Sequence, residues 1–130
     1  MVAELYRAMP AYVTGCESAL VLNARDTRGK LTAFFVLERA AERFDTYVLG
    51  CHSKAHYIPH ASDLLFADMI ARARERGVPE INLGLGVNQG IRRFKTKWGG
   101  QPYLDYEFCE CYFGPPKQLS VLASLLGEGL

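Results

Sequence analysis

All three histidines of the sequence fall within one short stretch, LGCHSKAHYIPH, which covers residues 49 to 60. His52, His56 and His60 recur at every fourth position, so on a continuous helix they would form one stripe suited to zinc. Pro59 argues against that helix, because proline removes a backbone donor and disfavours helical geometry at the residue before it. We therefore predict no metal site. The stretch is interpreted either as a polar loop that lines a ligand cleft or as a plain surface loop.

The position of this loop along the chain favours an anion. It follows a predicted strand and precedes a long predicted helix, and the free N–H groups and dipole at a helix N-terminus attract negative charge. Ser53 and Lys54 could donate hydrogen bonds to a phosphate there. The imidazoles of His52 and His56 could do the same, which makes these four residues candidates for a ligand site.

A second candidate site is the glycine-rich, basic stretch LGLGVNQGIRRFKTKWGG, residues 83 to 100. Gly84 and Gly86 would let a ligand approach the backbone closely. A dinucleotide fingerprint G-x-G-x-x-G would need a third glycine where the sequence has Gln89, so nicotinamide cofactors are set aside. The four basic side chains that follow are interpreted either as a ligand-facing group or as a solvated helix face.

Hydrophobic periodicity predicts the elements that carry these stretches. Strands on short connections are predicted at residues 19–22, 31–38 and 43–50, which indicates an antiparallel meander. A helix follows from about residue 62 to Gly77, and the next strand, 80–87, would pair in parallel through a right-handed crossover. The remaining predictions are helices at 3–9, 89–98 and 115–130, the last of them apolar, and a strand at 103–113.

Composition excludes several classes of protein. About half of the 130 residues are apolar, enough for one core, so residues 1–130 are predicted to form a single domain. A net charge of +1 supplies no long-range attraction to DNA or to an anionic membrane. Since no stretch approaches the roughly 20 apolar residues of a membrane span and the N-terminus shows no export signal, we expect a cytoplasmic protein without membrane insertion.

The order of these elements resembles the GNAT (N-acetyltransferase) superfamily. ASDLLFADMIARARERGVPEINLGLGVNQGIRRFKTKWGG, residues 61 to 100, is more specifically similar to the C-terminal repeat of the Fem-type peptidoglycan aminoacyltransferases. In that repeat a helix carries G-[IL]-x-x-F-K-x-x-[FW]-G, which here is the segment from Gly90 to Gly99. The resemblance implies an α+β fold with a mixed, mostly antiparallel sheet, helices on both faces and a truncated N-terminus.

The resemblance also implies an active site between two splayed parallel strands, where the arm of an acyl donor bonds to exposed backbone. Lys95 would stabilise the developing oxyanion. The sequence presents no clear acidic general base for the amine, which leaves His52, His56 or water for that role. The candidate donor-binding residues are Gly50, Ser53, Lys54, Gly84, Gly86, Asn88 and Phe94.

We therefore predict an acyl or aminoacyl transferase that moves an activated acyl group to an amine. The loop CHSKAHYIPHAS stands where coenzyme A users carry Q/R-x-x-G-x-G/A, so acyl-coenzyme A and aminoacyl-tRNA are both kept as donor substrates. No tightly bound cofactor is predicted. One alternative is a non-catalytic binding or assembly module of the same fold, with the apolar C-terminal helix as a homodimer interface. The other is a metal-dependent hydrolase that uses the three histidines.

Overall fold

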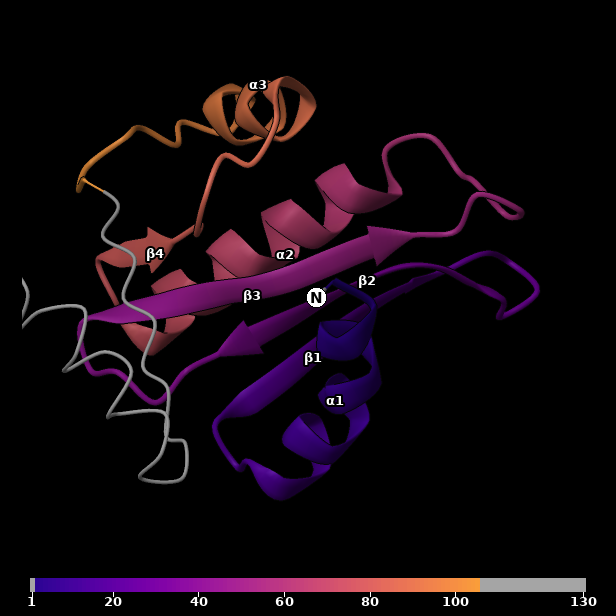
Figure 1. Cartoon of the computed structure of the whole chain (residues 1–130), viewed down its shortest axis with the longest axis horizontal. Coiled ribbons are helices and arrows are strands. Elements are labelled where there is room, and N and C mark those ends of the chain that lie inside the picture. The colour runs from indigo at the N-terminus through magenta and orange to yellow at the C-terminus, as the bar shows by residue number, and fades with distance from the viewer. Residues whose placement is uncertain (1, 106–130) are drawn as a thin grey trace, which may run out of the picture. The chain divides into compact units, whose positions relative to one another are not determined.

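A computed structural model describes residues 2–105, and the chain divides into two units, Met1–Gly100 and Gln101–Leu130. The described residues of the first unit form three helices and four strands (Figure 1). In the second unit the described residues, 101–105, form neither helix nor strand. Most of the strand predicted at 103–113 lies outside the described residues, as does the whole apolar helix predicted at 115–130 with its dimer interface.

The four strands form one mixed sheet in the order β1-β2-β3-β4. β1 (Ala19–Arg25), β2 (Leu31–Glu38) and β3 (Phe44–His52) make the predicted antiparallel meander. β4 (Glu80–Asn82) pairs with β3 in parallel. β2 lies between two partners and is largely buried, which agrees with the apolar residues on both of its faces.

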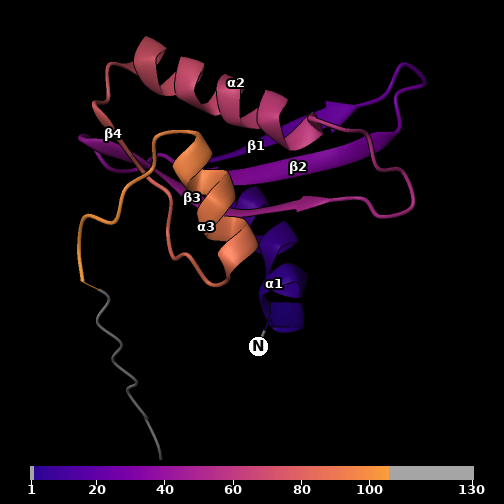
Figure 2. The same cartoon turned by 90° about the horizontal axis from the view of Figure 1, so that it is seen from above.

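Helices cover both faces of the sheet (Figure 2). α2 (Ala61–Arg76) crosses one face, α1 (Val2–Gly15) lies on the other, and α3 (Gln89–Lys97) packs against α2 through aromatic contacts. This confirms the predicted α+β class with a mixed, mostly antiparallel sheet. Within residues 2–105, no helix has the length and apolarity needed to cross a bilayer.

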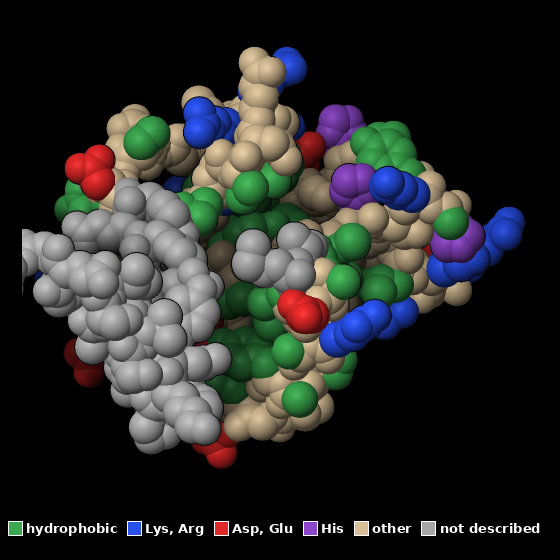
Figure 3. Space-filling view, viewed as in Figure 1, with side chains coloured by type: hydrophobic (Ala, Val, Ile, Leu, Met, Phe, Trp, Pro, Cys, Tyr) green, Lys and Arg blue, Asp and Glu red, His purple; other side chains and the backbone are tan. Residues whose placement is uncertain are grey.

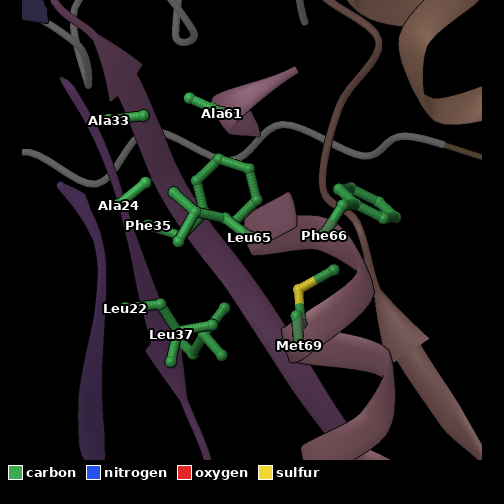
Figure 4. Close-up of a cluster of buried hydrophobic side chains, with 9 residues drawn as sticks. All are labelled: Leu22, Ala24, Ala33, Phe35, Leu37, Ala61, Leu65, Phe66 and Met69. Carbon is green, nitrogen blue, oxygen red and sulfur yellow. The ribbon is translucent and has the colours of Figure 1, made fainter. Parts of the chain in front are cut away.

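The core lies between α2 and the sheet. α2 ends as predicted at Gly77, which has φ +77° and donates its N–H to the last turn. Apolar residues at helical spacing on α2 meet alternate residues of β1 and β2, so the two periodicities meet on one face. Figure 4 shows the nine buried side chains of this cluster: Leu22, Ala24, Ala33, Phe35, Leu37, Ala61, Leu65, Phe66 and Met69.

Helix α1 corrects one prediction, because it continues through Pro10, where the sequence predicted its end. Proline costs a helix one backbone hydrogen bond. Contacts on both sides of Pro10 hold α1 to the sheet: the Tyr6 hydroxyl donates to Gly50 O, and the Tyr12 hydroxyl donates to the Glu38 carboxylate. Tertiary contacts therefore outweigh the local preference to stop.

The predicted length of the fourth strand was also wrong, because β4 ends at Asn82 rather than near residue 87. The last parallel pair is Thr46 with Asn82. Directly after it β3 contains a bulge, since Leu37 pairs with Tyr47 and Val36 pairs with Leu49, leaving one extra residue on β3. A bulge bends its strand and increases its twist, so β3 turns away from its parallel neighbour here.

Candidate active site

The candidate site is the place where β3 and β4 stop pairing, which we call the strand fork. Its arms are residues 47–52 of β3 and residues 83–87, which follow β4. Figure 1 shows the chain after β4 leaving β3 and rising towards α3. Among residues 2–105, no strand therefore pairs across the fork with the backbone of either arm beyond Thr46 and Asn82.

On the β3 arm, the peptide groups of Gly50 face the fork. The Ser53 N–H donates to Thr32 O at 2.7 Å, so these two residues form a hydrogen-bonded pair of the antiparallel ladder. Hydrogen-bonded and non-hydrogen-bonded pairs alternate along such a ladder, which makes Gly50 and Phe35 a non-hydrogen-bonded pair. The N–H and C=O of Gly50 consequently point away from β2, and Tyr6 donates to that oxygen at 3.3 Å.

Tyr47 stands at the base of the fork, with its ring edge-on to Phe35 at a centroid distance of 5.0 Å. A Cβ added to Gly50 would lie 2.4 Å from the Tyr47 hydroxyl oxygen, so glycine is needed to admit this side chain. Burial, with smaller effects from Tyr6 and Cys51, raises the pKa of Tyr47 to about 12. The hydroxyl therefore keeps its proton at neutral pH. No motif in the sequence marks Tyr47 as a site residue, because its position in an apolar strand is typical of a core aromatic.

Lys95 reaches from α3 across the fork and contacts both arms. Its ammonium donates to Leu83 O and, at 2.6 Å, to Leu85 O, and the nitrogen lies 5.7 Å from the centroid of the Tyr47 ring. An ammonium has three N–H donors, so one is left after these two carbonyls. Burial lowers the pKa of Lys95.

Helix α3, which carries Lys95, is held by a cap at its N-terminus and by an aromatic contact with α2. Asn88 caps the helix by accepting the Ile91 N–H at 2.9 Å. Phe94 packs edge-on against Phe66 of α2, with ring centroids 5.3 Å apart. The structure thus gives Asn88 and Phe94, both predicted to bind the donor, contacts that position the lysine.

Gly84 and Gly86 are each required by the local backbone or by a neighbour. Gly84 has φ +64°, in the left-handed region that favours glycine, and lies beside the Tyr47 carbonyl. A Cβ on Gly86 would lie 2.6 Å from the Arg92 side chain, whose Nε donates to Gly86 O at 2.9 Å. Arg92 therefore occupies the open side that the sequence assigned to a ligand.

The histidine loop lies at the C-terminal end of β3, where Figure 3 shows the histidine side chains in purple. The rings of His52 and Tyr57 pack edge-on, with their centroids 5.6 Å apart. Ser53 Oγ accepts the backbone N–H of His56 at 3.0 Å. Lys54 is exposed. Neither of these histidines hydrogen-bonds to Lys95, and no three metal-binding side chains gather anywhere in residues 2–105.

Two hollows border this loop, with volumes of about 130 and 260 Å³. Residues 51–53 help line the first, and residues 58–61 help line the second. Both are smaller than the roughly 300 Å³ at which ligand pockets usually begin. Neither hollow would enclose a donor substrate by itself.

A protein side chain, Asp63, occupies the start of α2, where the sequence predicted an anion. Its carboxylate accepts hydrogen bonds from Lys97 at 2.7 Å, from His60 at 3.0 Å and from Trp98 at 3.0 Å. These bonds, that of Lys97 foremost, lower the pKa of Asp63 to about 2. The carboxylate ties α3 to the N-terminus of α2 and places negative charge where a phosphate would dock.

Comparisons with known proteins give the fold a name. No protein-family model matches the sequence, and no curated protein matches it significantly. A solved ribosomal-protein-alanine N-acetyltransferase from Brucella melitensis biovar Abortus 2308 superposes with a TM-score of 0.65 at 17% identity, over 86% of this chain and 88% of that chain. The chain adopts the GNAT fold.

Two further solved structures share this fold. An aminoglycoside 6'-N-acetyltransferase from Acinetobacter haemolyticus has a TM-score of 0.66 at 12% identity, over 86% of this chain and 82% of that chain. An aminoglycoside N-acetyltransferase in complex with CoA has a TM-score of 0.66 at 9% identity, over 84% of this chain and 87% of that chain. At such identities the likeness establishes the fold alone, and the more specific resemblance to Fem-type enzymes stays a prediction.

Proposed function

We propose that the protein is an acyltransferase that moves an activated acyl group from its donor to an amine. The observation that carries this proposal is the Lys95 ammonium, which is held between the two arms of the strand fork. Exposed strand backbone can bind an extended ligand as an added strand would bind. The peptide groups beyond Thr46 and Asn82, which pair with no strand across the fork among the described residues, offer such a surface, with a cation beside it.

The reaction assigns a role to each side chain of the fork. The acceptor amine attacks the acyl carbonyl carbon, and Lys95 stabilises the oxyanion that forms, an interaction typically worth about 3 kcal/mol. As the bond to the leaving group breaks, the protonated Tyr47 hydroxyl donates a hydrogen bond or its proton to that group. His52, His56 or water accepts the proton that the amine loses.

Acyl-coenzyme A is the donor that the fold favours, because a neighbour of this fold was solved in complex with CoA. Ser53 and Lys54 of the histidine loop would meet the polar end of the donor. Asp63 at the start of α2 disfavours a phosphate at that helix. Aminoacyl-tRNA is therefore kept as the second donor class.

Thermal unfolding with each donor tests this proposal. A ligand that binds only the folded state at 100 times its Kd stabilises by about 2.7 kcal/mol, enough to raise Tm by several degrees. We expect that shift with acetyl-coenzyme A and none with adenosine 3',5'-bisphosphate, which lacks the arm and the acyl group. An unchanged Tm with both acetyl-coenzyme A and aminoacyl-tRNA in large excess would contradict donor binding.

A non-catalytic binding module is the second candidate, and one observation favours it. The Lys95 ammonium is engaged by two backbone carbonyls, as a purely structural lysine would be. Release of free thiol from acetyl-coenzyme A in the presence of a panel of amines separates the two functions. Donor binding without amine-dependent thiol release would favour the module.

A further inference from the structure

The Lys95 ammonium occupies two backbone carbonyls of the arm that follows β4. Leu83 and Leu85 are two residues apart on the arm that follows β4, and both carbonyls accept from one ammonium. Gly84, between them, has φ +64°, so this arm is not extended here, and its two carbonyls converge on the ammonium. A ligand whose N–H groups bond to this arm would therefore compete with Lys95 for the same two oxygens.

Both arms of the fork are closed in this way by side chains. On the β3 arm, the Tyr6 hydroxyl donates to the Gly50 oxygen that faces the fork. On the other arm, the half-buried Lys95 side chain contributes two charge-assisted bonds, which are about twice as strong as neutral ones. To bond to the carbonyls of Leu83 and Leu85, a donor must replace the two hydrogen bonds of Lys95.

We propose that Lys95 and the acyl donor compete for the carbonyls of Leu83 and Leu85, and that donor binding moves the ammonium from these oxygens to the acyl carbonyl. This inference rests on the proposed function. It also defines the donor class: an extended arm that carries secondary amide N–H groups can make the exchange. A small acyl phosphate or a simple thioester has no such donors and would leave Lys95 in place.

The exchange makes energetic sense for a catalyst. Holding Lys95 on neutral carbonyls costs donor affinity, because the free protein must give up those bonds on binding. The ammonium then meets a full negative charge only as the oxyanion forms, so its interaction is concentrated in the transition state. The Tyr47 ring, 5.7 Å away, attracts the cation throughout and keeps it in the fork.

Calorimetric titration with coenzyme A tests the exchange in the wild type, Lys95→Met and Lys97→Met. Methionine retains much of the length of lysine and has no N–H donors. Lys97 lies on the same helix but bonds to Asp63, so its variant controls for the loss of one positive charge near a polyanion. We expect Lys95→Met to bind coenzyme A at least about fivefold more tightly than Lys97→Met.

The outcomes separate this inference from the proposed function. If coenzyme A binds all three proteins and Lys95→Met binds no more tightly than Lys97→Met, the competition is wrong while donor binding stands. If coenzyme A binds none of them, the proposed donor and the competition both fail. If Lys95→Met does not fold, the ¹⁵N signal of the Lys95 ammonium in the wild type tests the exchange instead. Saturating coenzyme A should shift this signal if the ammonium moves. An unchanged signal would refute the exchange.

Discussion

Two ionisable side chains whose pKa values shift in opposite directions lie at the base of the strand fork. Tyr47 is an acid whose pKa burial raises to about 12, while Lys95 is an amine whose pKa burial lowers. Burial is the main cause in both cases, so the bulge and the packing of α3 set the chemistry of this pair. The two backbone carbonyls on Lys95 favour its charged form against that burial.

The first prediction concerns turnover by Lys95→Met at saturating donor. We expect the rate of acyl transfer to fall about 100-fold, which corresponds to the roughly 3 kcal/mol that one oxyanion donor contributes. Lys97→Met should keep most of the wild-type rate, because Lys97 bonds to Asp63 outside the fork. Equal rates for Lys95→Met and Lys97→Met would remove Lys95 from the mechanism.

The second prediction concerns alkaline stability and Tyr47. A pKa raised from 10.0 to about 12 means that the folded state keeps a proton that the unfolded state loses, so stability is complete below pH 10 and falls as pH rises to 12. Tyr47→Phe should lose less free energy of unfolding than the wild type over this range. Urea titrations at pH 9 and pH 11 measure it, with exposed Tyr57→Phe as control. A wild-type loss reproduced in full by Tyr47→Phe would contradict the account.

At the scale of elements, the fork exists because β3 bends while β4 stops. Gly50 contributes by admitting the Tyr47 side chain, and this gives the third prediction. Gly50→Ala should cost about 1–3 kcal/mol in urea unfolding, because the new methyl group overlaps Tyr47 and Phe35. Gly15→Ala is the matched control: nothing lies within 4 Å of its added Cβ, so the change should be neutral or slightly stabilising. Equal stability of the two variants would show that Tyr47 does not depend on Gly50.

Sequence patterns predicted most elements, and the two errors at this scale share one cause. The run from Ile81 to Val87 alternates like a strand, yet its pairing ends after Asn82, next to the bulge in β3, and Gly84 has φ +64°. The helical run before Pro10 was predicted to end there, yet Tyr6 and Tyr12 bind the sheet from both sides of the proline. In both cases a segment distant in the sequence influences where the element ends, and local periodicity cannot reveal that contact.

The candidate site could be predicted from the sequence only in part, for a related reason. Lys95 stood out because it belongs to a motif, and Phe94 because it accompanies Lys95. Tyr6 and Tyr47 lie in α1 and β3 without any motif, and only folding brings them to one fork. The loop with His52 and His56 was a candidate because of its composition. In the structure, His56 bonds to Ser53 and His52 packs against Tyr57, which are residues of the same loop.

At the scale of the whole first unit, two carboxylates hold the outer helices. Glu38 accepts from Ser18 and from Tyr12 of α1, and these bonds lower its pKa to about 2. Asp63 does the same for α3 through Lys97 and Trp98. A folded pKa below the unfolded value means that stability is present above the unfolded pKa and is lost as pH falls towards 2. Acid should therefore release α1 and α3.

The fourth prediction tests the attachment of α3. Asp63→Ala should lower the free energy of unfolding by about 1–2 kcal/mol at pH 7, because it removes a charged acceptor from Lys97 and Trp98. The difference from wild type should vanish as pH falls from 3.8 to about 2, where the wild-type carboxylate takes up its proton. Asp68→Ala removes an exposed pair with Arg72 and should cost at most about 0.5 kcal/mol. A larger loss in Asp68→Ala than in Asp63→Ala would contradict this assignment.

The central claim is that the strand fork binds the acyl donor, and backbone amide NMR during titration with coenzyme A tests it most directly. We expect the largest shifts to fall on residues 47–52 and 83–87 and to saturate together with a single Kd. Shifts confined to other parts of the chain, with both arms of the fork unchanged at saturation, would contradict it.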